Sequence, residues 1–355
     1  MIIRLKFKVL LIFSAFILII GLYLSFFANN ANVVTADSNK DFIKWVDFRV
    51  SYNAMDKALK ADIASVDEDV KLNWVELLAY LGTRYGGDFA RYKSKDMDVL
   101  INKLKNGTSI EELTKDLKHY GYYFEAYSAV LGNFVGPCEI QVKDENDPSK
   151  KVWVKKYGLK VFSPIAAGYG YSHYDDFGNS RSYGFRRVHL GNDLVGSVGT
   201  PIVAVETGRI EALGWNQYGG WRIGIRSLDN MRYYYYAHLR KDHPYVKTLK
   251  EGDIVYAGDV IGYLGMTGYS RKENVNNINT PHLHFGMQLV FDESQKEALA
   301  EIWIDVYKIA KLLNRSRSSV IYNKDTQESE RIYDIRFHNV PERTLHYNTE
   351  TTAEP

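Results

Sequence analysis

His189-Leu190-Gly191-Asn192-Asp193 and, farther along the chain, His282-Leu283-His284 are the two stretches around which this sequence is organised. Neither pattern is specific alone, because nine histidines in 355 residues produce such spacings by chance. Both stretches, however, lie among glycine turns and short runs of β-branched or aromatic residues, which predict β-strands. His238 ends one such aromatic run between them. A single histidine at a strand end is usually a packing or surface residue, so the constellation carries the prediction of a site.

These residue types suit a catalytic zinc centre, which takes three His or carboxylate ligands and leaves one position for water. His189, Asp193 and one histidine of the 282/284 pair would supply two nitrogens and one oxygen. Residues two apart in a strand point to the same face, so His282 and His284 should enter one site, one on the metal and the other beside it. The metal would activate water and polarise a carbonyl. The spare histidine and His238 would move protons or hydrogen-bond the tetrahedral intermediate.

Length and composition limit the number of domains, the kinds of partner and the disulfides that the chain can have. A chain of 355 residues suits two domains, or one large domain with appendages. The formal net charge of +2 and the lack of a basic stripe argue against a nucleic-acid partner. The single cysteine, Cys138, excludes an intramolecular disulfide framework.

The N-terminus predicts a membrane anchor. Three basic residues within residues 1–8 precede an uninterrupted apolar run over residues 9–27. As a helix this run would span about 28 Å, close to the hydrocarbon thickness of a bilayer. The positive-inside bias places residues 1–8 in the cytoplasm and the rest of the chain outside. A cleaved signal peptide is the alternative, but the residues that follow form a poor cleavage site, so the uncleaved anchor is favoured.

A linker over residues 28–40 leads to a helical accessory domain, predicted over 41–136. Apolar side chains recur at helical spacing in 70–85, and further helices are predicted within this domain over 96–104, 113–119 and 122–131. No residues there have the spacing of metal ligands or of a nucleophile and its base. A packing or spacer role is therefore the favoured interpretation of this domain.

An all-β domain is predicted over 137–314. It begins with a strand pair within 140–162 and a long loop over 163–187, which is expected to be functional because long loops in compact domains usually are. Short strands over 199–290 suggest a twisted antiparallel sheet or a sandwich. A helix over 297–313 should cover the sheet.

Three further features leave alternatives open. Tyr183 could bring its hydroxyl to the site or simply pack. The four consecutive tyrosines at 233–236 must alternate across the sheet, so two should face the groove, where they stack on sugar rings or, as is favoured, pack. Residues 315–355 read as a polar, partly disordered tail.

Residues 162–305 resemble the M23 family of zinc metallopeptidases, the lysostaphin and LytM type. The preceding helical segment is similar to the accessory region of membrane-anchored clostridial members. The resemblance gives the fold class as α+β, with a transmembrane helix, a helical accessory region and an antiparallel all-β peptidase domain covered by a C-terminal helix. The matching pieces are His189-Leu190-Gly191-Asn192-Asp193, residues 199–204, Tyr236-Ala237-His238-Leu239, the glycine-rich stretch 252–268 and His282-Leu283-His284-Phe285.

The resemblance implies one Zn²⁺ per chain, bound by His189, Asp193 and His284. It implies that His282 and His238 are the catalytic histidines and that Tyr183 helps to stabilise the oxyanion. The implied activity is a metalloendopeptidase that hydrolyses peptidoglycan, in a cross-bridge or a stem peptide, outside the cell membrane.

Two other functions compete with this one. A catalytically silent M23-like scaffold would join a partner in the cell envelope, and its sequence signature would be a lost ligand, which is not seen here. A carrier-like β module would account for the repeated Gly-Asp spacing but would leave the histidines unexplained. A regulatory envelope protein is a possible partner of the enzyme itself.

Overall fold

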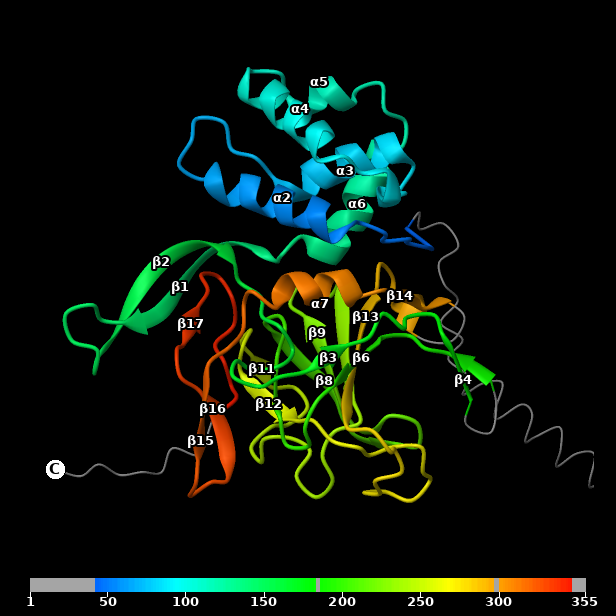
Figure 1. Ribbon diagram of the computed structural model, residues 1–355, viewed down its shortest axis with the longest axis vertical. Coiled ribbons are helices and arrows are strands. Elements are labelled where there is room, and N and C mark those ends of the chain that lie inside the picture. Colours follow the sequence, from blue (N-terminus) through cyan, green and yellow to red (C-terminus); the bar gives the residue numbers. More distant parts are fainter. Residues whose placement is uncertain (1–41, 183–185, 297–299, 347–355) are drawn as a thin grey trace, which may run out of the picture. The chain divides into compact units, whose positions relative to one another are not determined.

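The computed structural model describes residues 42–182, 186–296 and 300–346, and from Ile43 onward the chain belongs to one compact unit (Figure 1). The predicted anchor at residues 9–27 lies outside these residues. Within the described part of the chain, no helix is long and apolar enough to span a bilayer.

The helical region begins and ends its helices with side-chain and backbone caps. Ser51 Oγ accepts a hydrogen bond from the Ala54 amide, and Asn73 Oδ1 caps the next helix, which ends at Gly86 in the left-handed conformation, φ 62°. Gly suits that position because it has no Cβ. The helices are α2 (Tyr52–Ala64), α3 (Trp74–Tyr85), α4 (Ser94–Lys105), α5 (Ile110–Thr114) and α6 (Tyr120–Leu131).

The helices predicted within 70–85, 96–104 and 122–131 are therefore confirmed, with shifted ends. The prediction over 113–119 is wrong, because α5 ends at Thr114. Helix α3 starts only after residue 73 because Asn73 uses its side chain to cap the helix instead of joining it.

An eight-stranded antiparallel sheet forms the centre of the β region, which confirms the predicted antiparallel architecture (Figure 1). Its strand order is β11-β8-β9-β10-β13-β6-β3, and β14 adds to β13 beside β6. The strands are β3 (Ser172–His173), β6 (Asn192–Val195), β8 (Gly208–Asn216), β9 (Gly220–Ser227), β10 (Arg232–Ala237), β11 (Ile254–Val255), β13 (His282–Leu289) and β14 (Ile302–Ile304).

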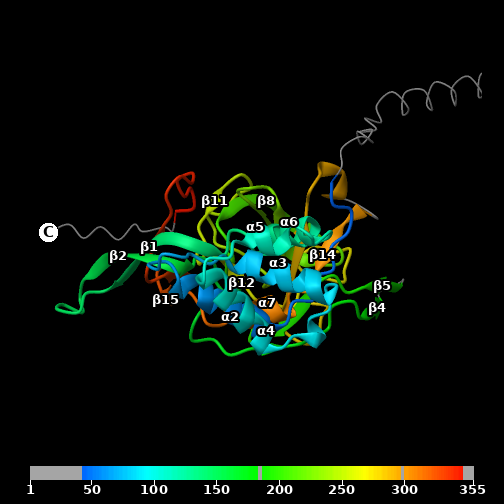
Figure 2. The ribbon, with the colours of Figure 1, turned by 90° about the horizontal axis from the view of Figure 1, so that it is seen from above.

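Smaller sheets surround this one. The hairpin of β4 and β5 projects at the periphery (Figure 2). The remaining strands are β1 (Val135–Lys143), β2 (Lys151–Leu159), β4 (Ser180–Ser182), β5 (Arg186–Val188), β7 (Pro201–Val203), β12 (Val260–Tyr263), β15 (Val320–Asn323), β16 (Glu328–Arg331) and β17 (Ile335–Arg336).

The end of the described chain differs from the prediction in two ways. In place of one helix over 297–313, the structure has β14 at Ile302–Ile304 and a shorter helix, α7 (Tyr307–Leu313); residues 297–299 are outside the described part. Ile302 and Ile304 are both buried, and this two-residue spacing of buried side chains is that of a strand. The polar tail also contains a hairpin, β15–β16, and β17, which pairs with β1.

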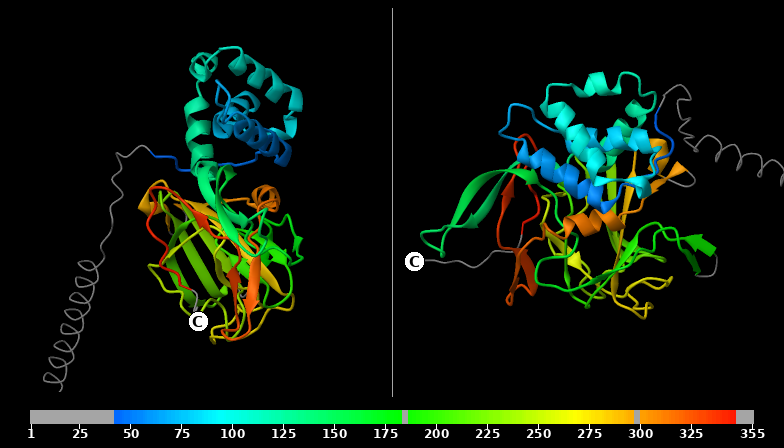
Figure 3. Two further views of the ribbon diagram at one scale, coloured as in Figure 1. Left: turned by 90° about the vertical axis from the view of Figure 1, so that its left-hand side faces the viewer. Right: turned by 45° about the horizontal axis from the view of Figure 1, so that its top comes forward.

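Helix α7 lies between the helical region and the sheet, where it contacts α2 (Figure 3). A second link is Arg232 at the start of β10, whose side chain is 0% exposed. Its guanidinium donates to the Ala129 carbonyl oxygen in α6 and pairs with Glu206 at 2.8 Å. The helical region is thus tied to the end of a central strand through a buried charge.

Candidate functional site

The register between β6 and β13 brings the predicted ligands together. His284 is the cross-strand partner of Asp193, and His284 Nδ1 lies 3.4 Å from Asp193 Oδ1. His189, just before β6, places Nε2 3.1 Å from Asp193 Oδ1 and 2.8 Å from His284 Nδ1. One ligand atom from each of the three residues lies within 4.8 Å of the others.

The donor set at this cluster fits a divalent metal such as zinc. Asp193 Oδ1 is buried, and although nitrogens of His189 and His284 lie 3.1 Å and 3.4 Å away, none of the described residues forms a well-aligned hydrogen bond with it. A buried carboxylate oxygen without a partner is costly, so its position beside two imidazole nitrogens is explained if a cation binds there.

Gly191 makes the close approach of these elements possible. A Cβ at this position would lie 2.7 Å from the Phe285 carbonyl oxygen and 2.8 Å from the His284 ring. Contacts this short cannot be accommodated without moving β13. The glycine between His189 and Asp193 is therefore required by the packing of the site.

The charged side chains of the cluster shift one another's pKa values. Burial alone would lower the pKa of His189, but the adjacent carboxylates of Asp176 and Asp193 outweigh burial and raise that pKa to about 9. Burial would raise the pKa of Asp193, yet the adjacent imidazoles of His189 and His284, with the nearby His282, hold the pKa well below its usual range. In the absence of a metal, the carboxylate is thus ionised and His189 carries a proton.

His282 and His238 stand beside this cluster. His282 Nε2 lies 3.6 Å from Asp193 Oδ1, so the two histidines of β13 face the same site, as the strand period predicts. The ring centroids of His238 and His282 are 4.8 Å apart. Nδ1 of His238 donates to the Thr267 carbonyl oxygen at 2.9 Å, and Nδ1 of His282 donates to the Thr280 carbonyl oxygen at 2.8 Å. A ring that donates from Nδ1 in its neutral form leaves Nε2 unprotonated and directed away from that carbonyl.

His238 has two unusual properties. Its φ of 62° lies in the left-handed region, which non-glycine residues rarely occupy and which is frequent at functional sites. Burial, reinforced by the neighbouring His282 and His284, holds its pKa well below the usual range. His238 is thus a neutral imidazole at physiological pH.

Sequence reasoning missed Asp176 and Arg181. His189 Nδ1 donates to the Asp176 carbonyl oxygen at 3.0 Å and lies 3.3 Å from its Oδ2, while Asp176 Oδ1 accepts from the Asp193 amide at 3.2 Å. Arg181 pairs with both carboxylates, at 2.5 Å to Asp176 Oδ2 and 3.3 Å to Asp193 Oδ2. Both residues belong to the stretch 163–187, whose length was the one available signal. It was predicted as one long loop, but the short strands β3 and β4 divide it, and Arg181 lies in β4. Such partners orient metal-binding histidines and carboxylates.

Tyr183, predicted from the resemblance, lies outside the described residues. The four tyrosines of β10 alternate as predicted. Tyr234 and Tyr236 are fully buried in the core, whereas Tyr235 lines the cleft beside the metal cluster and Tyr233 packs beneath Arg226, 5.1 Å from its guanidinium carbon.

A cleft of about 270 Å³ opens beside His189, His284 and His238. Apart from these three histidines, its lining is mainly aromatic and apolar, with one guanidinium, so a peptide would find both aromatic surfaces and a charged contact there. The other lining residues include Arg187, Tyr218, Tyr235, Tyr269 and Trp303.

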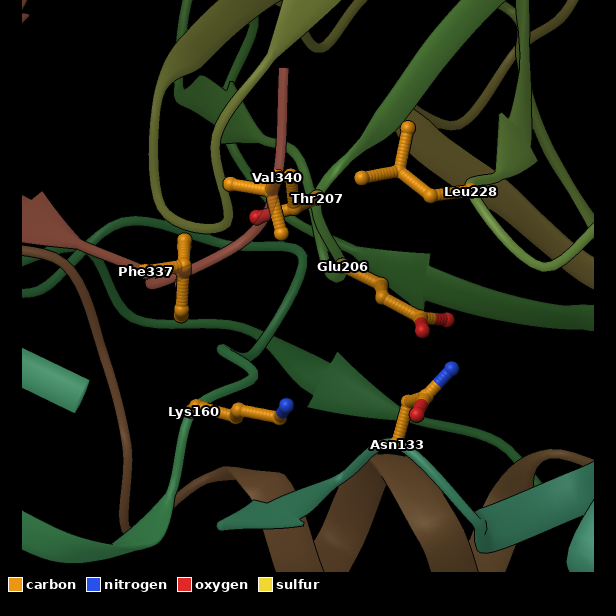
Figure 4. A pocket seen from close by; sticks show the side chains of 7 residues that line it. All are labelled: Asn133, Lys160, Glu206, Thr207, Leu228, Phe337 and Val340. Atoms are coloured by element: carbon orange, nitrogen blue, oxygen red, sulfur yellow. The ribbon is translucent and has the colours of Figure 1, made fainter. Parts of the chain in front are cut away.

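A second cavity lies away from this cleft. Asn133, Lys160 and Glu206 point into it (Figure 4). Glu206 is held by Arg232 at 2.8 Å and accepts from Tyr234 Oη at 2.6 Å. The Glu206 carboxylate therefore belongs to the structural link between the sheet and the helices.

Two histidines and an aspartate that converge on one point, with two further imidazoles beside them, form a group that could hold a metal ion in a hydrolase site. The profile of Peptidase family M23 matches residues 187–297. This segment is an M23 peptidase domain, homologous to the lysostaphin-type endopeptidases.

Two curated relatives show the extent of the likeness. The chain is 40% identical over 124 residues to the L-Ala–D-Glu endopeptidase of Bacillus subtilis (strain 168), covering 35% of this chain and 36% of the relative. It is 38% identical over 119 residues to lysostaphin of Staphylococcus simulans, covering 33% of this chain and 20% of that protein. The matched region is thus about a third or less of each relative's length.

The likeness to a solved structure extends farther along the chain. A putative glycyl-glycine endopeptidase, lytM, from Ruminococcus gnavus covers 80% of this chain and 95% of its own, with a TM-score of 0.52. At 23% identity this match shows a shared fold.

Proposed function

We propose that this protein is a zinc-dependent endopeptidase that hydrolyses a peptide bond in peptidoglycan. The single observation that carries the proposal is the convergence of His189, Asp193 and His284, with the buried Asp193 Oδ1 lacking any other partner among the described residues. Relatives named as endopeptidases, one of them a peptidoglycan endopeptidase, support the substrate class.

Zinc bound by these three residues would supply Lewis acidity and an activated water. The side chains of the protein would do the rest. His282, whose Nε2 lies nearest the cluster, would accept a proton from the attacking water and later donate it to the leaving amine. His238, whose ring centroid lies 4.8 Å from that of His282, would share the proton that His282 takes from the water and would direct it toward the developing oxyanion.

The proposal includes a location outside the membrane. Its support is the sequence pattern of residues 1–27, which predicts an anchor with a cytoplasmic N-terminus. Tyr183 would assist at the oxyanion, and a regulatory envelope protein would be a partner of the anchored enzyme.

The test is digestion of defined peptidoglycan fragments by the full chain, with and without a chelator. The expected result is cleavage that the chelator abolishes and zinc restores. A His189→Ala variant that cleaved purified peptidoglycan at the wild-type rate would falsify the assignment. Metal binding without cleavage would favour the competing scaffold function.

A further inference from the structure

Arg187 holds a guanidinium in the wall of the cleft that contains His189 and His284. It lies in β5, two residues before His189 in the sequence. Its guanidinium carbon lies 4.8 Å from the ring centroid of Tyr269 and 5.6 Å from that of Tyr218. Nη2 donates to the Tyr269 hydroxyl oxygen. These contacts orient the planar group within the cleft.

This guanidinium has no carboxylate partner among the described residues, unlike that of Arg181, its cross-strand partner in β4, which pairs with Asp176 and Asp193. Arg187 forms no ion pair within the described parts of the chain, and its Nε is buried without a hydrogen-bond partner there. A positive charge in the wall of a cleft, with N–H donors to spare and no counter-ion in the described part of the chain, favours an anionic ligand.

We infer that Arg187 is a specificity-determining residue that binds a free carboxylate on the substrate residue next to the cleaved bond. A carboxylate matches the fork of N–H donors on a guanidinium, and the bond to a charged acceptor is among the strongest hydrogen bonds. The inference rests on the proposed endopeptidase function and narrows its substrate class.

The two kinds of peptide named by the relatives differ in this group. A glutamyl residue uses one carboxylate to continue the chain and keeps a second one free, whereas an internal glycine has none. The contact from Arg187 therefore favours a bond beside a glutamyl residue, in a stem peptide, over a bond within a glycine cross-bridge.

The experiment compares three substrates with the full chain loaded with zinc. They are a stem-type peptide containing L-Ala–D-Glu, the same peptide with the free glutamyl carboxylate converted to an amide, and a glycine pentapeptide. The carboxylate peptide should have the highest kcat/KM, about tenfold to a hundredfold above the amide. Arg187→Gln should remove this difference, by lowering kcat/KM for the carboxylate peptide alone, and Arg187→Lys should restore part of it.

Arg186→Gln is the matched control. It removes the same charge from the adjacent residue of β5, where the exposed Arg186 donates to Ser180 Oγ at 3.0 Å outside the cleft. It should leave the preference unchanged. Zinc content and melting temperature are measured for every variant, so that a misfolded protein is recognised.

The outcomes distinguish a failure of the inference on Arg187 from a failure of the proposed endopeptidase function. Equal kcat/KM for the carboxylate and amide peptides, faster cleavage of the glycine peptide, or an equal loss on both stem peptides in Arg187→Gln would overturn the inference. If the wild type cleaves none of the substrates, the proposed function fails. Calorimetric binding of the two stem peptides to wild type and Arg187→Gln then decides the recognition role alone.

Discussion

His284 and Asp193 face each other as cross-strand partners of β13 and β6, with His284 Nδ1 3.4 Å from Asp193 Oδ1. The site therefore depends on strand register as much as on residue identity. A slip of one residue would turn one of the two side chains to the opposite face of the sheet.

The two histidines of β13 should differ when each is replaced. His284→Ala should lose both bound zinc and activity, because it removes a metal ligand. His282→Ala should retain zinc and lose roughly a hundredfold to ten-thousandfold in kcat, the usual contribution of a proton-transferring residue. Zinc content measured beside turnover checks the split. Equal loss of zinc in both variants would contradict these roles.

Gly191→Ala should disrupt the site without unfolding the domain. The added methyl group would stand 2.8 Å from the His284 ring and 2.7 Å from the Phe285 carbonyl oxygen, so β13 must shift. We expect weakened zinc binding and little remaining activity, measured by calorimetry and peptide hydrolysis. Gly170→Ala is the control, because nothing lies within 4 Å of the Cβ position there.

Asp176→Ala should weaken zinc binding by about tenfold to a hundredfold, the typical effect of removing a residue that orients a metal ligand. The variant loses the carboxylate that lies 3.3 Å from His189 Nδ1 and accepts from the Asp193 amide. The adjacent, exposed Asp175 provides the comparison, and Asp175→Ala should bind zinc like the wild type. Similar losses in both would argue for a general effect of negative charge.

Zinc affinity should rise with pH. Despite burial, the adjacent carboxylates of Asp176 and Asp193 raise the pKa of metal-free His189 to about 9, so below that pH the imidazole is protonated and zinc must displace the proton. The dissociation constant should fall about tenfold per pH unit as the pH rises from 6 toward 9, and then level off. Calorimetric titrations of the metal-free protein in several buffers measure this slope. A flat profile would mean that His189 is already neutral.

Arg232→Met should lower the free energy of unfolding by about 3–5 kcal/mol, because it leaves the buried Glu206 carboxylate without its cation. It also removes the hydrogen bond to the Ala129 carbonyl oxygen. Denaturant unfolding measures the change. Arg209→Met removes an exposed arginine from β8 and should change the value by less than about 0.5 kcal/mol.

The sequence predicted the parts of the site whose spacing reflects local structure. His282 and His284 share a face because they are two apart in a strand, and the HLGND stretch carries His189 and Asp193 together. Asp176 and Arg181 were missed, because their positions depend on how the chain between β3 and β5, including the short strand β4, folds back on β6, and no periodicity in the sequence indicates that path.

The same distinction explains the errors in the fold. Helices with a clear apolar stripe, such as α3, were predicted well. The segment around Ile302–Ile304 fits either a helical stripe or a short strand, and pairing with β13 decides between them. β17 is two residues long and forms through its distant partner β1, so the local sequence contains little sign of it.

The position of β14 has a practical consequence for anyone who shortens the protein. The family match stops at residue 297, before Ile302–Ile304 pair with Met287–Leu289 of β13. A fragment that ends at residue 297 would leave the backbone amides and carbonyls of Met287–Leu289 unpaired along that edge. An exposed strand edge of this kind can pair with another chain and lead to aggregation. Soluble material should therefore require an end point beyond Leu313, where α7 is complete.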